Sequence, residues 1–136
     1  MRKNEQLFWD LIGKYLPGDV SRIENTVDAG TPDITCAAWG RDYWVELKSH
    51  PDADYISMTQ VEKWIEPAQR VWHARRSKVG SLIFLIVRFR TEILAWYAEG
   101  ITYVPAFHLV KLGNGYNWTH MKEAIRNHCD HTKLVF

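Results

Sequence analysis

The chain has 136 residues, 46% of them hydrophobic, and a formal net charge of +1 at pH 7. This length predicts one domain over residues 1–136, large enough for a single core. No segment approaches the roughly 20 apolar residues of a membrane span, and residues 1–6 lack the apolar stretch of a signal peptide. Cys36 and Cys129 are the two cysteines and give no disulfide framework, so we expect a soluble protein of the reducing cytoplasm with no membrane partner.

The apolar pattern predicts alternating helices and strands. Asn4 is a candidate N-cap for a helix that Pro17-Gly18 ends. Pro67 should kink or split a second helical segment, because it removes one hydrogen bond and crowds the preceding turn. The remaining expected elements are strands at 20–27, 34–39, 43–47, 81–89 and 92–98, a less regular region from 100 that resumes at 107–112, a helix from Ser57 or Thr59 to Gly80, and a helix from Asn117 or Thr119.

Residues 34–39 and 43–47 are separated by Gly40-Arg41-Asp42 and predict a hairpin that carries three charges. Side chains alternate across a strand, so Glu46 and Lys48 share one face. Simple pairing places Asp33 opposite the end of the second strand, within reach of both. The sequence therefore predicts two carboxylates and one ammonium at a single point.

Two carboxylates at close range repel each other, and one lysine neutralises only one of them. A divalent cation would resolve the conflict, and a small set of oxygen ligands with room for water and phosphate favours Mg²⁺. Lys48 would then hold the attacking water and stabilise charge on the phosphate. The alternative is a strand-end ion pair beside an unrelated turn aspartate, which is what an isolated Glu-x-Lys usually is.

Charge is distributed unevenly along the chain. Residues 24–66 contain nine acids and three bases, whereas residues 68–91 contain six bases and no acid. Bases of this kind neutralise backbone phosphates, while the acidic half would hold the cation. The alternative is a solvated basic helix face. The candidate nucleic-acid contacts are Arg75, Arg76, Lys78, Arg88 and Arg90.

The residues Gly30-Thr31-Pro32-Asp33 and Glu46-Leu47-Lys48 resemble the signature of the PD-(D/E)XK nucleases in its Glu-x-Lys form. Residues 22–25, 44–49 and 59–64 are similar to the corresponding segments of phage-type VRR-NUC proteins and archaeal Holliday junction resolvases. The resemblance covers residues 20–90. It implies an α/β fold with a restriction-endonuclease-like core, a mixed central β-sheet flanked by helices.

The resemblance also implies roles for individual residues. Asp33 and Glu46, with the Leu47 carbonyl, would hold Mg²⁺, with Mn²⁺ able to substitute. Lys48 would be the catalytic lysine, and Gln60 the glutamine that many members carry on the helix after the signature.

Many members of the superfamily add one more acid to the metal site. Glu5 in the first helix and Glu24 just before the signature are the two candidates, and we prefer Glu24 because phage-type relatives show this pattern. The helix dipole alone would also favour Glu5 near a helix start.

Two aromatic residues near the predicted site, His50 and Trp64, have either a structural or a substrate-binding role. His50 falls in a predicted loop at 49–55, where it is either a surface histidine or a contact for substrate phosphate. Trp64 is either a core residue or a platform on which a base stacks.

The predicted function is that of a Mg²⁺-dependent endodeoxyribonuclease with DNA as its partner. The resemblance favours a homodimeric resolvase of branched DNA, in the host cytoplasm if phage-encoded, with a nicking or repair endonuclease as a close alternative. We expect no nucleotide cofactor, because Gly113-Asn114-Gly115 lacks the lysine and serine of a phosphate-binding loop. A non-catalytic nucleic-acid-binding module and an RNA-cleaving nuclease are the further alternatives.

Overall fold

The computed structural model describes residues 3–23, 30–53 and 56–132. Within these ranges, six strands form one sheet in which spatial order follows chain order. Only β3 and β4 are parallel, and the other neighbouring strands pair antiparallel. The sheet is therefore mixed, as predicted. Its strands are β1 (Asp19–Arg22), β2 (Ile34–Ala38), β3 (Arg41–His50), β4 (Leu82–Phe89), β5 (Glu92–Glu99) and β6 (Thr102–Val110).

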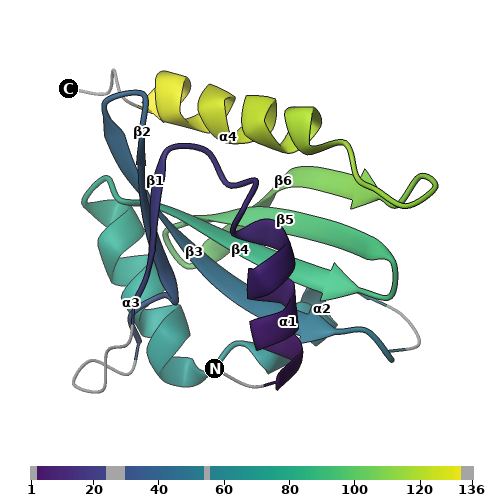
Figure 1. Cartoon of the computed structure of the whole chain (residues 1–136). Helices are drawn as coiled ribbons and strands as arrows, with labels where there is room; N and C mark the ends of the chain where they lie inside the picture. The colour runs from purple at the N-terminus through teal and green to yellow at the C-terminus, as the bar shows by residue number, and fades with distance from the viewer. Residues whose placement is uncertain (1–2, 24–29, 54–55, 133–136) are drawn as a thin grey trace.

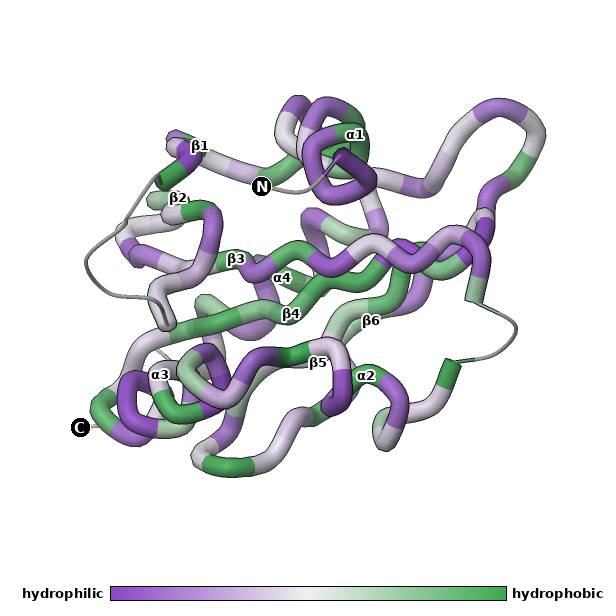
Figure 2. The backbone as a smooth tube through the Cα atoms, turned by 90° about the horizontal axis from the view of Figure 1, so that it is seen from below, coloured by the Kyte–Doolittle hydropathy of each residue, from purple (hydrophilic) through white to green (hydrophobic). Residues whose placement is uncertain are grey.

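Helices cover both faces of the sheet, which confirms the predicted α/β architecture (Figure 1). Figure 2 shows α1 on one side of β3 and β4, with α2 and α3 on the other. No helix in the described part of the chain is long and apolar enough to cross a membrane. The helices are α1 (Lys3–Ile12), α2 (Met58–Trp64), α3 (Pro67–Lys78) and α4 (Trp118–Thr132).

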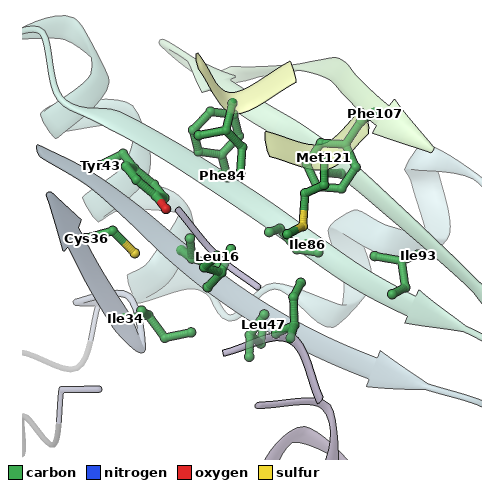
Figure 3. Close-up of a cluster of buried hydrophobic side chains, with 14 of the residues drawn as sticks. Leu16, Ile34, Cys36, Tyr43, Leu47, Phe84, Ile86, Ile93, Phe107 and Met121 are labelled. Carbon is green, nitrogen blue, oxygen red and sulfur yellow. The ribbon is translucent and has the colours of Figure 1, made fainter. Parts of the chain in front are cut away.

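The largest apolar cluster lies between the sheet and the α1/α4 layer. Leu47 of β3, Phe84 of β4 and Met121 of α4 belong to it, and Figure 3 shows their side chains converging. The opposite face packs more thinly, with Val61 of α2 and Trp72 of α3 against β4 and β5. β4 is buried from Leu82 to Val87, as its unbroken apolar run predicts for a central strand.

The β2–β3 hairpin is tighter than predicted. Ala38 pairs with Arg41, so Trp39 and Gly40 alone form the loop, with φ of 53° and 73°. Positive φ at both central residues matches the right-handed twist of the strands. β3 then continues to His50, which corrects the prediction of a loop beginning at residue 49.

Pro67 splits the second helical segment instead of kinking it. α2 ends at Trp64, and Pro67 is the first residue of α3, where its missing N–H costs nothing. Glu66 caps α3 in a reciprocal capping box with Gln69. The sequence thus encodes two short helices where a single one spanning residues 57–80 was the simplest expectation.

Smaller differences concern the ends of elements. α1 already includes Lys3, so Asn4 lies within it and is not its cap. Residues 24–27 of the predicted first strand lie outside the described residues. The region after Gly100 is a regular strand, β6, with Pro105 at a register shift against β5, where a missing N–H is tolerated. Asn117 does cap α4, since its Oδ1 accepts the His120 N–H at 3.0 Å.

Candidate active site

The hairpin register brings Asp33 to Glu46. Ile34 pairs with Val45, so the residue before β2 lies opposite the next residue of β3. Asp33 Oδ2 accepts the Leu47 N–H at 3.3 Å, and Asp33 lies close enough to Glu46 to raise the pKa of its carboxyl. The two carboxylates therefore meet just before β2 begins, where the edge of β3 is open.

Lys48 completes the group on the same face of β3. Alternation along the strand directs Tyr43, Val45 and Leu47 into the main core, and Glu46 and Lys48 toward the α2/α3 layer. Only 7% of Lys48 is exposed. Its positive charge acts on Glu46, where it favours the ionised carboxylate. The structure thus places the three predicted charges together.

Glu46 is the most perturbed group of the site. It is 1% exposed, and burial raises the pKa of its carboxyl well above 4.5, with the Asp33 charge adding to the effect. Lys48 offsets only part of this rise in pKa. Glu46 Oε1 is buried and has no hydrogen-bond partner among the described residues. A buried acceptor without a donor is costly, so this oxygen is suited to binding a cation.

A cleft of about 910 Å³ opens above these side chains. The predicted site residues Asp33, Glu46 and Lys48 line it, together with residues from α1 and from the α2–α3 region. Three lysines, three glutamates and one aspartate line the cleft, so it carries both signs of charge. The lining residues are Lys3, Asn4, Glu5, Asp33, Glu46, Lys48, Ser49, His50, Lys63, Trp64, Glu66 and Gln69.

Of the two candidate extra acids, the structure describes Glu5 alone. Glu5 lines the cleft, and its charge contributes to the raised pKa of Glu46. Glu24 lies outside the described residues. Within the described ranges no three His, Cys, Asp or Glu side chains form a ready metal cluster. The donors in place are therefore the Asp33 and Glu46 carboxylates.

The Leu47 carbonyl fits the same donor set. The N–H and C=O of one strand residue point to the same strand edge, and the Leu47 N–H points to Asp33. β2 begins at Ile34, so beyond this point it offers no strand partner on that side. Two carboxylates and one carbonyl are hard oxygen ligands of the kind that Mg²⁺ uses while it keeps several waters.

Gln69, not Gln60, is the glutamine that lines the cleft. The backbone N–H of Gln60 donates to Ser57 Oγ at 3.2 Å in the first turn of α2. Gln69 is 9% exposed, and its Oε1 accepts the Glu66 N–H at 3.0 Å. This bond leaves the Gln69 amide nitrogen as a donor toward the cleft. The spacing of Glu66 and Gln69, which is that of a capping box, is the sequence signal that would have located it.

The predicted basic contacts do not gather at the cleft. Arg75, Arg76 and Lys78 occupy the last turn of α3, and Gln69 lies about 10 Å from Arg76 along the helix. Arg76 stacks on the Trp72 ring at 4.9 Å. These side chains form a separate basic surface at the far end of the helix.

The two strand-end arginines also lie apart from the cleft lining. Arg88 pairs with Ser49 across β3 and β4, so its side chain points to the α1/α4 face. Arg90 donates from Nε to the Ala53 carbonyl at 3.0 Å. The cleft instead takes its outer positive charge from Lys3 and Lys63, which the sequence analysis did not select because both lie outside the basic stretch at 68–91.

His73 and Tyr103 form a hydrogen-bonded pair close enough to Lys48 to feel its charge. His73 of α3 is 1% exposed, and its Nδ1 is hydrogen-bonded to Tyr103 Oη of β6 at 2.8 Å. Burial lowers the pKa of His73 to about 4, and the Lys48 charge adds to this. His73 is therefore neutral at pH 7, so it places no second positive charge beside Lys48.

Comparison with known proteins gives a likeness to solved structures but no match by sequence. No protein-family model matches the chain, and no curated protein matches it. Among solved structures the chain is similar to Hjc, a Holliday junction resolvase from Archaeoglobus fulgidus. The two share 19% identity and a TM-score of 0.41 over 71% of this chain and 75% of that one. A likeness of this degree assigns no activity, so the chemistry of the site rests on its own residues.

Proposed function

We propose that this protein is a Mg²⁺-dependent endonuclease that hydrolyses phosphodiester bonds in DNA. The observation that carries the proposal is the pair of neighbouring carboxylates in a large cleft, with Glu46 buried, Asp33 half-buried and Lys48 beside them. Two repelling carboxylates, one of them buried, cost the fold stability. Their presence supports a function that needs negative charge there.

Asp33, Glu46 and the Leu47 carbonyl would hold the metal, with Mn²⁺ able to replace Mg²⁺. Such an ion polarises a phosphoryl oxygen and lowers the pKa of a bound water. The unpartnered Glu46 Oε1 supports this assignment, since a cation would supply the interaction that the protein leaves out. Glu5, on the cleft wall, is the nearest described acid that would extend the set.

The chain's own residues supply the remaining chemistry. Lys48 positions the attacking water and stabilises charge that develops on the phosphate. Gln69, which lines the cleft, donates its amide N–H to a phosphate oxygen. Lys3 and Lys63 neutralise the phosphates on either side of the scissile bond.

The specific form of this proposal is a resolvase of four-way DNA junctions that acts as a homodimer. It is supported by the residues resembling archaeal resolvases between positions 20 and 90. Symmetric cleavage of a junction needs two active sites, which a two-fold dimer would supply. The basic surface of Arg75, Arg76 and Lys78 would then hold DNA arms away from the cut.

A cleavage assay tests the proposal directly. Purified protein is incubated with linear, flapped and four-way DNA, and with RNA of the same sequence, in Mg²⁺ or in EDTA. We expect cleavage of DNA only when Mg²⁺ is present, no cleavage by Glu46→Ala and at most residual cleavage by Lys48→Ala. Glu123→Gln, a change at an exposed position on α4, is the matched control that should cleave normally.

The same assay separates the competing functions. DNA binding without cleavage in any divalent metal would identify a binding module and refute the proposal. Preferential cleavage of the RNA would refute the DNA assignment. Full activity of Glu46→Ala would show that the carboxylate pair is not the catalytic centre.

A further inference from the structure

Two stacked aromatic rings form one wall of the cleft. His50 is the last residue of β3 and Trp64 is the last residue of α2, and their ring centroids lie 3.7 Å apart at 14°. Both residues line the cleft, and both are partly exposed. Trp64 also packs against the α2 cluster that contains Val61. The indole therefore belongs to the core at one edge and to the cleft at another.

The pair lies at a defined distance from the charged centre. His50 is two residues beyond Lys48 on the same strand face, which corresponds to about 6.6 Å along β3. A nucleic-acid strand rises about 3.4 Å per nucleotide, so this is one to two nucleotides from a phosphate held at Lys48. Lys63, next to Trp64, lines the same wall and would face the backbone of that segment.

A paired base does not reach such a wall. In a duplex both faces of each base are covered by its neighbours, whereas an unpaired base can leave the stack and lie on a side-chain ring. Among the described residues of the cleft lining, His50 and Trp64 are the only rings. A base displaced into this cleft would therefore stack on this pair.

We infer that Trp64, backed by His50, binds an unpaired base one to two nucleotides from the scissile phosphate. The substrate class is then DNA with single-stranded nucleotides beside the cut, such as a flap or a junction branch point, and intact duplex is a poor substrate. The effects on cleavage that follow from this inference depend on the proposed nuclease function. The stacking contact is independent of catalysis and can be measured alone.

Binding is tested with 2-aminopurine, whose fluorescence is quenched when it stacks on an aromatic ring. The probe is placed in a flapped DNA one or two nucleotides from the cut, or far along the duplex arm, in EDTA. Wild-type protein should quench the near probe only. Trp64→Ala should lose this quenching, and Trp64→Phe should keep most of it, because phenylalanine retains a ring and fills the α2 cluster.

Cleavage gives the second measurement. Trp64→Ala should lower kcat/KM on the flapped DNA by about 5- to 150-fold, the range expected for one base–aromatic stack. Trp64→Phe should stay near wild type, and cleavage of fully paired DNA should change less than twofold in both. Circular dichroism melts establish that Trp64→Phe is folded.

The outcomes distinguish this inference from the proposed function. Cleavage with no quenching of the near probe, or an equal loss by Trp64→Ala on flapped and paired DNA, would overturn the stacking site and leave the nuclease in place. Quenching restricted to the near probe, without cleavage of any DNA, would support the stacking site and refute the catalytic proposal.

Discussion

Replacing Glu46 with glutamine should stabilise the metal-free protein and remove its response to Mg²⁺. Glu46 is 1% exposed and its side chain contacts Asp33. Above the raised pKa of Glu46, a glutamine amide would donate to the Asp33 carboxylate and replace a repulsion by a hydrogen bond to a charged group, worth about 1.5–3 kcal/mol. At roughly 4 °C per kcal/mol for this chain length, the melting temperature should rise by about 6–12 °C.

The same carboxyl sets a pH dependence with a definite sign. Burial and Asp33 raise the pKa of Glu46 in the folded state above its ordinary value of 4.5. Protonation therefore favours folding, and this contribution to the free energy of unfolding is fully present below the unfolded-state pKa. It is lost as the pH rises through the raised folded-state pKa. The melting temperature of the wild type relative to Glu46→Gln should fall over this window.

Thermal melts followed by circular dichroism, in EDTA and over a series of MgCl₂ concentrations, measure both effects. A ligand that binds only the folded state adds about 2.7 kcal/mol at 100 times its Kd, so the wild type should gain stability as Mg²⁺ rises. Glu46→Gln should not respond, and Glu123→Gln on α4 should behave like the wild type. A Glu46→Gln protein that is less stable than wild type in EDTA, or that Mg²⁺ stabilises equally, would refute the reasoning.

Three further predictions concern the site and its supports. Lys48→Ala should lower the single-turnover cleavage rate of the folded protein by about 10²–10³-fold, because it removes a donor aimed at developing charge; normal cleavage would contradict this role. Tyr103→Phe removes the partner of His73 and should cost about 1–3 kcal/mol in urea unfolding. Gly30→Ala should destabilise similarly or more, since its Cβ would lie 2.4 Å from an α3 carbonyl oxygen, whereas Gly115→Ala meets no atom within 4 Å. Equal urea midpoints of the glycine variants would contradict the packing argument.

The hairpin and the convergence of its charges followed from local rules. A period of two assigns Glu46 and Lys48 to one face and Val45 to the other, whatever the rest of the chain does. The length of the loop fixes which residue lies opposite Glu46. The predicted three-residue loop would pair Cys36 with Glu46, whereas the two-residue loop of the structure places Asp33 opposite Glu46. Local rules therefore gave the hairpin and the shared face of Glu46 and Lys48, but the exact register depended on the turn.

The contribution of the helices could not be read in the same way. Whether Pro67 bends or interrupts a helix depends on what the two halves pack against, and that packing is non-local. The interruption makes Gln69 part of a capping box and turns it to the cleft, while Gln60 remains at the start of α2. The close contact of Gly30 with the α3 backbone also joins segments that are far apart in sequence.

The basic residues show a second reason for a missed prediction. Arg75 and Arg76 are neighbours in the sequence, but they lie at the C-terminal end of a 12-residue helix, and the cleft lies at its N-terminal end. Lys3 and Lys63 reach the cleft from α1 and α2, and they are 60 residues apart in the sequence. Tertiary packing alone brings them together.

The alternation of side chains along β3 limits how this protein can change. Inserting one residue between Tyr43 and Glu46 would turn Glu46 toward the apolar interior and a core residue toward solvent. Such a length change would damage folding and catalysis in one step, whereas substitutions can adjust either face alone. We therefore expect length variation to be confined to the connecting segments, and an engineered insertion after Gly113 to be tolerated where one within β3 is not.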